Sequence, residues 1–171
     1  MRIDRGIVLA AGASKRLGSH KALIEVEGET LVELVCSKLQ SAGLSVTVVT
    51  RNSLEQKIEN LLPNVSTVVN PNPELGRTGT IQRGIESIGA GPLLIAPVDR
   101  PGFSLETINL LCETNTTTIP TYKEKGGHPI AITSQDCENI MQAEPDIPLR
   151  ELISPETVSY THLTLPTICS V

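Results

Sequence analysis

Short apolar runs alternate with segments of helical periodicity along most of the chain. The runs are rich in β-branched and aliphatic residues and predict five strands, at residues 7–9, 46–50, 65–69, 93–96 and 118–120. Apolar positions three and four residues apart predict four helices, at residues 31–42, 54–62, 79–88 and 105–112. Strands that alternate with helices favour a parallel sheet covered on both faces. We therefore predict an α/β fold, a three-layer α/β/α Rossmann-like domain with a mostly parallel sheet.

Composition narrows the class of protein. The 171 residues fit one domain, and the formal net charge of −5 excludes a broadly basic surface for nucleic acid or an anionic membrane. The three aromatic residues are too few for stacking bases. The four cysteines lack the CxxC spacing of zinc sites, and no apolar run is long enough for a membrane span. We expect a cytoplasmic protein with small-molecule partners, a monomer or small homo-oligomer.

A loop of small residues follows the first predicted strand. Residues 10–14 read AAGAS, and small side chains there let backbone N–H groups approach a ligand, with Gly12 free to adopt a positive φ. Three cations follow closely, Lys15, Arg16 and Lys21, which suit a triphosphate. Neither the Walker A nor the dinucleotide-binding spacing is met. Two alternatives without ligand binding stay open at this point, a structural turn at Gly12 and a solvated charged loop.

The carboxyl ends of parallel strands share one edge of a sheet, and ligands bind there. Asp99 follows an apolar strand at this edge, where a carboxylate can hold Mg²⁺ against phosphates. The alternative for Asp99 is a turn or helix-capping aspartate before Pro101. His128 stands between Gly127 and Pro129, and we interpret it as a residue of a binding loop rather than a general base.

Several segments resemble those of one family. Residues 9–18, LAAGASKRLG, followed by Lys21, resemble the LAAGxSxRMGxxK signature of MobA-like nucleotidyltransferases, which have a GT-A-like Rossmann fold. Within that family the chain is most similar to molybdenum cofactor cytidylyltransferases. Further similar segments are NPNPELGRTGTIQRGI at 70–85, LLIAPVDRP at 93–101, KGGHP at 125–129 and DIPLRELI at 146–153.

The resemblance implies a role for each matching position. Arg16, Lys21 and Asp99 would be catalytic, with Asp99 also the ligand of Mg²⁺. The acceptor would contact Gly127, His128 and Pro129. Positions implied to bind the nucleotide are Leu9, Ala10, Ala11, Gly12, Ser14, Lys15, Asn70, Gly76 and Thr80.

The implied reaction transfers a nucleoside monophosphate to a phosphorylated acceptor and releases pyrophosphate. Catalysis then rests on positioning and electrostatics, because the acceptor phosphate is already a nucleophile. Ala11 makes the loop LAAG, typical of the cytidylyl branch, so CTP is the first donor and GTP, with LAGG, the second. The expected acceptor is molybdopterin. The alternatives are a sugar-phosphate or polyol-phosphate nucleotidyltransferase, and a truncated nucleotide-binding protein without turnover.

The chain departs from the family after residue 153. The family continues into an acidic segment that supplies a second metal ligand, whereas here no aspartate follows Asp146. We expect residues 1–158 to form a nucleotidyltransferase domain that is incomplete at its C-terminal end, and residues 159–171 to be a non-native tail. A metal would then depend on Asp99, triphosphate oxygens and water, which Mg²⁺ accepts.

Overall fold

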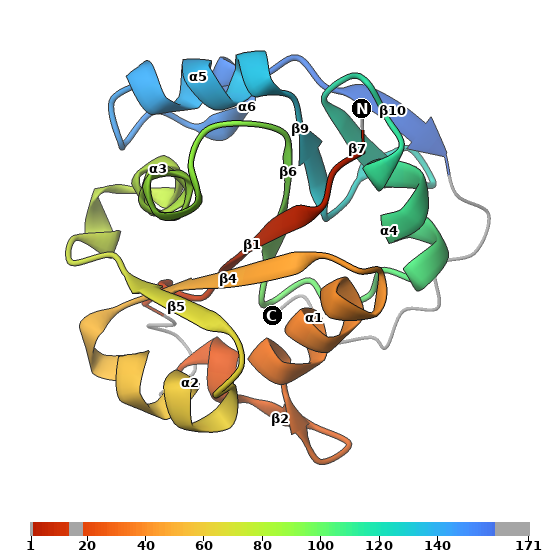
Figure 1. Ribbon diagram of the computed structural model, residues 1–171. Coiled ribbons are helices and arrows are strands. Elements are labelled where there is room, and N and C mark those ends of the chain that lie inside the picture. The colour runs from red at the N-terminus through yellow and green to blue at the C-terminus, as the bar shows by residue number, and fades with distance from the viewer. Residues whose placement is uncertain (1, 14–18, 160–171) are drawn as a thin grey trace.

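A mixed eight-stranded sheet forms the middle layer of the molecule (Figure 1). The computed structural model describes residues 2–13 and 19–159, and every structural statement below refers to these residues. The strand order is β10-β7-β9-β6-β1-β4-β5, with β8 paired to β7. The strands are β1 Arg5–Leu9, β4 Ser45–Thr50, β5 Ser66–Val69, β6 Leu93–Pro97, β7 Thr118–Tyr122, β8 Lys125–Gly126, β9 Ile130–Ile132 and β10 Glu156–Ser159.

The five predicted strands are all present as β1, β4, β5, β6 and β7. Neighbours among β5, β4, β1 and β6 pair in parallel, as does β10 with β7. Strand β9 lies antiparallel between β6 and β7, and β8 is antiparallel to β7. The mostly parallel α/β sheet is therefore confirmed, and β8, β9 and β10 are additions that the hydrophobic pattern did not predict.

Helices cover both faces of the sheet, which confirms the three-layer arrangement (Figure 1). One core cluster joins the sheet to α1, α2 and α4, and the other joins it to α3, α5 and α6. A small hairpin, β2 Glu25–Val26 and β3 Glu29–Thr30, precedes α1. The helices are α1 Leu31–Ser41, α2 Glu55–Leu61, α3 Arg77–Ile88, α4 Leu105–Cys112, α5 Ser134–Gln142 and α6 Leu149–Leu152.

Local signals explain where several helices begin. Thr30 caps α1 in a complete capping box, because its hydroxyl accepts from Glu33 N while the Glu33 carboxylate accepts from Thr30 N. Ser104 accepts from Thr107 N at the start of α4. Helix α3 begins two residues before the predicted Gly79, and the 146–153 segment forms only the single turn α6.

Helix α3 is held tightly against the central strand. A Cβ added to Gly84 would lie 2.8–2.9 Å from methyl groups of Ile7 and Val49, so only glycine allows this approach. At the far end of α3 the Arg5 guanidinium donates to three carbonyls, Ile88 O at 2.8 Å, Ala90 O at 2.9 Å and Pro92 O at 3.3 Å. The start of β1 and the end of α3 are thereby tied together.

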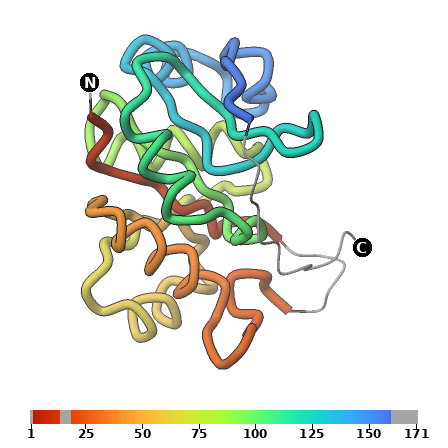
Figure 2. The backbone as a smooth tube through the Cα atoms, turned by 90° about the vertical axis from the view of Figure 1, so that its right-hand side faces the viewer, coloured from red at the N-terminus to blue at the C-terminus, as the bar shows by residue number. Residues whose placement is uncertain are grey.

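The two halves of the chain occupy different parts of the molecule. In Figure 2 the orange and yellow segments lie in the lower half and the blue segments in the upper half, with β1 between them.

Among the described residues, no helix is long and apolar enough to cross a membrane. Cys36, Cys112 and Cys137 are buried free thiols.

Candidate functional site

Three loops meet at the carboxyl edge of the parallel strands. Leu9 at the end of β1 is in register with Pro97 at the end of β6, and Thr50 at the end of β4 with Val69 at the end of β5. The loops that follow these strands carry residues 10–13, Asn70 and Asp99. The edge predicted to bind a ligand therefore brings the candidate residues of three segments together.

Two predicted catalytic residues touch at this edge. Lys21 Nζ lies 3.1 Å from Asp99 Oδ2, and their side chains are 42% and 32% exposed. Lys21 begins the short 3₁₀ turn Lys21–Leu23, whereas Asp99 lies two residues after β6. The third, Arg16, lies outside the described residues, as do Ser14 and Lys15.

The backbone beside this pair is built from small residues. Ala10 and Ala11 are buried, and Ala10 N donates to Val49 O at 2.8 Å, so the loop leaves the sheet in a defined direction. Gly12 is free to adopt a positive φ, but its φ in the structure lies outside that region. Among the described residues, none has an atom within 4 Å of a Cβ added at Gly12. No described residue therefore blocks the approach of a ligand to this part of the backbone.

Asn70, Gly76 and Thr80 shape the loop that leads into α3. Asn70 Nδ2 donates to Thr80 Oγ1 at 3.0 Å, and Asn70 Oδ1 accepts from Asn72 N at 3.0 Å. Gly76 has a φ of +141°, and a Cβ there would lie 2.6 Å from Pro145 O. The side chains of Asn70 and Thr80 are thus engaged with protein atoms, and their contact with a nucleotide stays a prediction.

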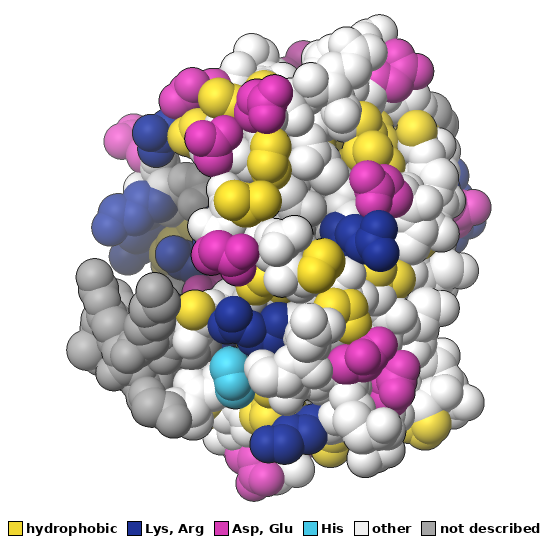
Figure 3. Space-filling view, turned by 90° about the vertical axis from the view of Figure 1, so that its left-hand side faces the viewer, with side chains coloured by type: hydrophobic (Ala, Val, Ile, Leu, Met, Phe, Trp, Pro, Cys, Tyr) yellow, Lys and Arg dark blue, Asp and Glu magenta, His cyan; other side chains and the backbone are white. Residues whose placement is uncertain are grey.

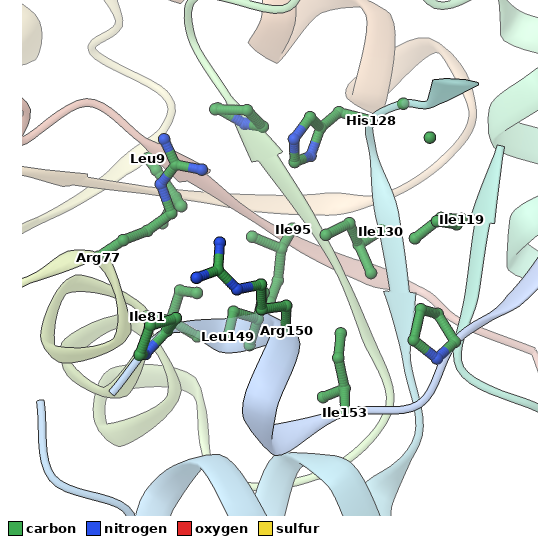
Figure 4. Close-up of a pocket in the computed structure, with 15 residues that line it drawn as sticks. Leu9, Arg77, Ile81, Ile95, Ile119, His128, Ile130, Leu149, Arg150 and Ile153 are labelled. Atoms are coloured by element: carbon green, nitrogen blue, oxygen red, sulfur yellow. The ribbon is translucent and has the colours of Figure 1, made fainter. Parts of the chain in front are cut away.

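A largely apolar cavity of about 470 Å³ adjoins the edge (Figure 4). It includes three predicted site residues, Leu9 for the nucleotide and Gly127 and His128 for the acceptor, whereas Pro129 is buried behind them. Two lining arginines, Arg77 and Arg150, were not predicted as site residues. The lining residues are Leu9, Arg77, Ile81, Ile95, Pro97, Ile119, Gly126, Gly127, His128, Ile130, Pro148, Leu149, Arg150, Ile153 and Pro155.

His128 is uncharged at neutral pH in this setting. Burial, as the largest cause, and the positive charges of Arg77 and Arg100 together lower the pKa of its imidazole from 6.5 to about 4, against the opposing effect of Asp99. Its Nδ1 is buried and has no hydrogen-bond partner among the described residues. The ring therefore offers an unsatisfied polar atom next to the cavity, in agreement with a binding role.

Asp99 fits the metal predicted for it. Within residues 2–13 and 19–159, no three His, Cys, Asp or Glu side chains cluster as a metal site. Mg²⁺ is commonly held by one or two carboxylates together with substrate phosphates and water. The Asp99 carboxylate at the carboxyl edge, with Lys21 beside it, matches that kind of site.

Comparison with known proteins identifies the family. The sequence matches the family described as the MobA-like NTP transferase domain over residues 6–162. The chain belongs to this family. The match covers the loop at Gly12, Asp99 and the cavity, so the residues described above lie within the MobA-like domain.

Curated relatives of this MobA-like chain carry one name. A probable molybdenum cofactor guanylyltransferase of Bacillus cereus strain G9842 is 32% identical over 111 residues, which are 63% of this chain and 54% of the relative. A protein of the same name from Bacillus cytotoxicus is 30% identical over 110 residues, 63% of this chain and 55% of the relative. The aligned region thus spans about half the length of these curated relatives.

Solved structures show the same fold. Rv0371c from Mycobacterium tuberculosis has a TM-score of 0.78 and 17% identity, over 92% of this chain and 88% of that one. A nucleotidyl transferase from Methanothermobacter thermautotroptrophicus has a TM-score of 0.75 and 21% identity, over 94% and 88% of the two chains. The predicted GT-A-like nucleotidyltransferase fold is confirmed.

Proposed function

We propose that this chain is a Mg²⁺-dependent nucleotidyltransferase that moves a nucleoside monophosphate from a triphosphate to a phosphorylated acceptor and releases pyrophosphate. The observation that carries this proposal is the 3.1 Å pair of Lys21 and Asp99 at the carboxyl edge, beside the open space over Gly12 and the apolar cavity. The match to the MobA-like family supports it independently.

The chain's own residues would act by positioning and by charge. Asp99 would supply the protein ligand of Mg²⁺, which when bound neutralises negative charge on the phosphates. Lys21 Nζ, now against Asp99, is within reach of a phosphate bound at the same place and would stabilise charge on it. Arg16 and Lys15 would add cations for the leaving pyrophosphate. No general base is needed, which agrees with an uncharged, buried His128 in a binding role.

Donor and acceptor are proposed from different observations. Ala11 in the LAAG loop supports CTP, whereas the name guanylyltransferase carried by the two Bacillus relatives supports GTP as the competing donor. The same names support molybdopterin as the acceptor, bound at Gly127, His128 and Pro129. The mostly apolar cavity lining disfavours the polyol-phosphate alternative, because buried hydroxyls would lack hydrogen-bond partners there.

A second candidate function is nucleotide binding without turnover. In the described part of the chain Asp99 is the carboxylate at the metal position, and no cluster of three metal-ligating side chains surrounds it. With one protein carboxylate on the metal, a nucleotide could be bound without being turned over. Strand β10, Glu156–Ser159, forms the edge of the sheet next to β7.

The test is calorimetric titration of CTP and GTP with and without Mg²⁺, followed by assay of pyrophosphate release with molybdopterin. The variants are Asp99→Asn and Lys21→Met, with Asp4→Asn, an exposed aspartate away from the site, as the matched control. We expect Mg²⁺-dependent binding of one nucleotide in the wild type and the control. Because metal neutralisation of phosphate charge is worth several kcal/mol, turnover should fall by at least roughly 1000-fold in Asp99→Asn.

The outcomes separate the candidates. Binding followed by pyrophosphate release supports the transferase and names the donor. Binding without pyrophosphate release supports the nucleotide-binding alternative. If neither nucleotide binds the wild type, or if both variants bind as the control does, the site is wrongly assigned and the loop at Gly12 is only a turn.

A further inference from the structure

Two arginines and a histidine direct their polar groups into the cavity from separate elements. Figure 4 shows the guanidinium groups of Arg77 and Arg150 and the imidazole of His128 pointing toward the same space above Ile95. Arg77 opens α3 and Arg150 lies in α6, whereas His128 precedes β9. Both arginines are exposed to solvent, and neither guanidinium group makes a hydrogen bond or an ion pair with a described residue. Two like charges thus face one cavity without a carboxylate to pair them.

Hydrogen bonds link the two segments that carry the arginines. Thr78 Oγ1 donates to Ile147 O at 2.6 Å, and Gly79 N donates to Pro145 O at 3.1 Å. One turn later, Gln82 Nε2 donates to Ile140 O at 2.8 Å and to Ala143 O at 2.7 Å. These bonds fasten the start of α3 to the segment that leads into α6. The backbone positions of Arg77 and Arg150 are therefore coupled, rather than set by independent loops.

The floor between these groups is apolar. Ile81, Ile95, Ile130 and Ile153 line the cavity, and the first two are almost completely buried. An aliphatic floor favours an apolar or flat ligand body, whereas two unpaired guanidinium groups favour an anion. The influence of Arg77 and Arg100 on the His128 pKa shows that their positive field reaches the interior of the site. Figure 3 shows Lys and Arg side chains interspersed with Asp and Glu side chains on one face of the molecule, in line with its acidic net charge.

We propose that Arg77, together with Arg150, selects the acceptor by binding an anionic group on an apolar body that lies on the isoleucine floor. This inference rests on the proposed function, because it assigns the cavity to the acceptor and the Lys21–Asp99 edge to the donor. Arg77 is then a specificity-determining residue. Neutral acceptors and polyol phosphates bind weakly, the first for lack of the anion and the second because their hydroxyls meet the isoleucines.

The experiment uses three probes of this cavity, titrated into the full chain in the presence of saturating Mg²⁺ and nucleotide. Naphthyl phosphate carries both features, naphthol lacks the anion and glycerol phosphate lacks the apolar body. The variants are Arg77→Met, which keeps the aliphatic stem, and the conservative Arg77→Lys. Arg83→Met is the matched control, because Arg83 lies on the same helix but pairs with Glu86 on the surface. Circular dichroism checks that each variant is folded.

We expect naphthyl phosphate to bind the wild type and Arg83→Met equally, and to bind Arg77→Met roughly 10-fold to 100-fold more weakly, as for the loss of a charge-assisted hydrogen bond. Arg77→Lys should recover part of this affinity, and naphthol binding should be the same in all variants. The inference is overturned if Arg77→Met binds naphthyl phosphate within about two-fold of the wild type, if glycerol phosphate binds as well as naphthyl phosphate, or if the wild type binds none of the probes.

The same variants separate this inference from the proposed function. Nucleotide affinity should be unchanged in Arg77→Met. If the nucleotide binds more weakly in Arg77→Met while the probe is unaffected, Arg77 belongs to the donor site and the inference fails, although the proposed function stands. If the wild type binds no nucleotide, the proposed function fails, and titration of the probes into the chain alone still decides whether Arg77 holds an anion.

Discussion

The two sides of the carboxyl edge handle charge in opposite ways. On one side Lys21 and Asp99 already neutralise each other at 3.1 Å in a half-exposed setting. On the other side Arg77 and Arg150 face an apolar cavity with no anionic partner among the described residues, and burial keeps His128 neutral. A ligand that binds at the Lys21–Asp99 pair must break their ion pair and replace its contacts. An anion that binds between the two arginines breaks no existing ion pair.

This difference assigns the two sides to different tasks. Metal-bound triphosphate carries both signs of charge, so it can replace both contacts of the Lys21–Asp99 pair at once. An anionic acceptor carries one sign, which fits a pocket that offers only positive charge. Each side of the edge can be perturbed separately, and the largest change in stability is expected at His128.

Acidification should lower the free energy of unfolding, because His128 beside the cavity takes up a proton. The pKa of His128 is lowered from 6.5 to about 4, so the unfolded chain takes up a proton at a higher pH than the folded one. Stability from this group is therefore complete above pH 6.5 and is lost as the pH falls toward 4. At about 1.4 kcal/mol per unit, the loss is on the order of 3 kcal/mol.

Denaturant unfolding at several pH values measures this effect. In His128→Gln the free energy of unfolding should vary less between pH 6.5 and pH 4. In Arg77→Met the loss of stability over this pH range should be smaller than in the wild type, because Arg77 is one cause of the lowered His128 pKa. If His128→Gln unfolds with the same pH profile as the wild type, another group is responsible and the cavity is not the acid-sensitive side of the edge.

The donor side should depend on Lys38, which holds the loop after Asp99. Lys38 Nζ donates to Pro101 O at 2.5 Å and to Phe103 O at 3.1 Å, and lies 5.3 Å from the centre of the Phe103 ring. Lys38→Met keeps the packing of the stem but removes these contacts. We expect the free energy of unfolding to fall by about 1–2 kcal/mol.

A positioning role for Lys38 predicts more than lost stability. Mg²⁺-dependent nucleotide binding should weaken in Lys38→Met and recover in Lys38→Arg, since the arginine can still donate to the two carbonyls. Lys57→Met, at an exposed position on α2, is the control. Equal nucleotide affinity in Lys38→Met and the control would show that the loop needs no such support.

The smallest effect on stability is expected at Gly12. Its added Cβ meets no atom within 4 Å and its φ is not positive, so Gly12→Ala should change the free energy of unfolding by less than about 0.5 kcal/mol. Nucleotide affinity should nevertheless fall by about 10-fold, because the methyl group enters the space assigned to the phosphates.

Gly84→Ala is the reciprocal control for Gly12. Its Cβ would lie 2.8–2.9 Å from Ile7 and Val49, which should cost about 1–3 kcal/mol in unfolding. Chemical denaturation and nucleotide calorimetry on both variants give the two readouts. A large loss of stability in Gly12→Ala would show that the loop is a structural turn rather than a phosphate-binding loop.

The regular elements were predictable because their signals are local. Helix α4 has the predicted bounds, Leu105–Cys112, and α1 begins at a capping box formed by two residues only three positions apart, Thr30 and Glu33. Strand β9 was missed, because its three residues follow a loop and are defined by pairing with β6 and β7 rather than by periodicity of their own. The single turn α6 was not among the predicted helices, because four residues are too few to show a helical period.

The candidate site was predictable where a motif marks it. Lys21 was selected as a cation close to the small-residue loop and Asp99 from its position after a strand, and the structure brings the two, 78 residues apart, into contact. Arg77 was missed because nothing in its local sequence links it to Arg150. That link is made by hydrogen bonds such as Thr78 Oγ1 to Ile147 O, which depend on the folded arrangement of α3 against the segment before α6.

The Arg5 bonds to the end of α3 bear on how the cavity opens. They couple one wall, the α3 helix with Arg77 and Ile81, to the central strand β1, so its amides should exchange with solvent hydrogen only when the core opens. The facing wall around Arg150 is a single helical turn that the Thr78 and Gln82 bonds tie to α3 only through the segment before it, so the amides of α6 should exchange faster than those of α3.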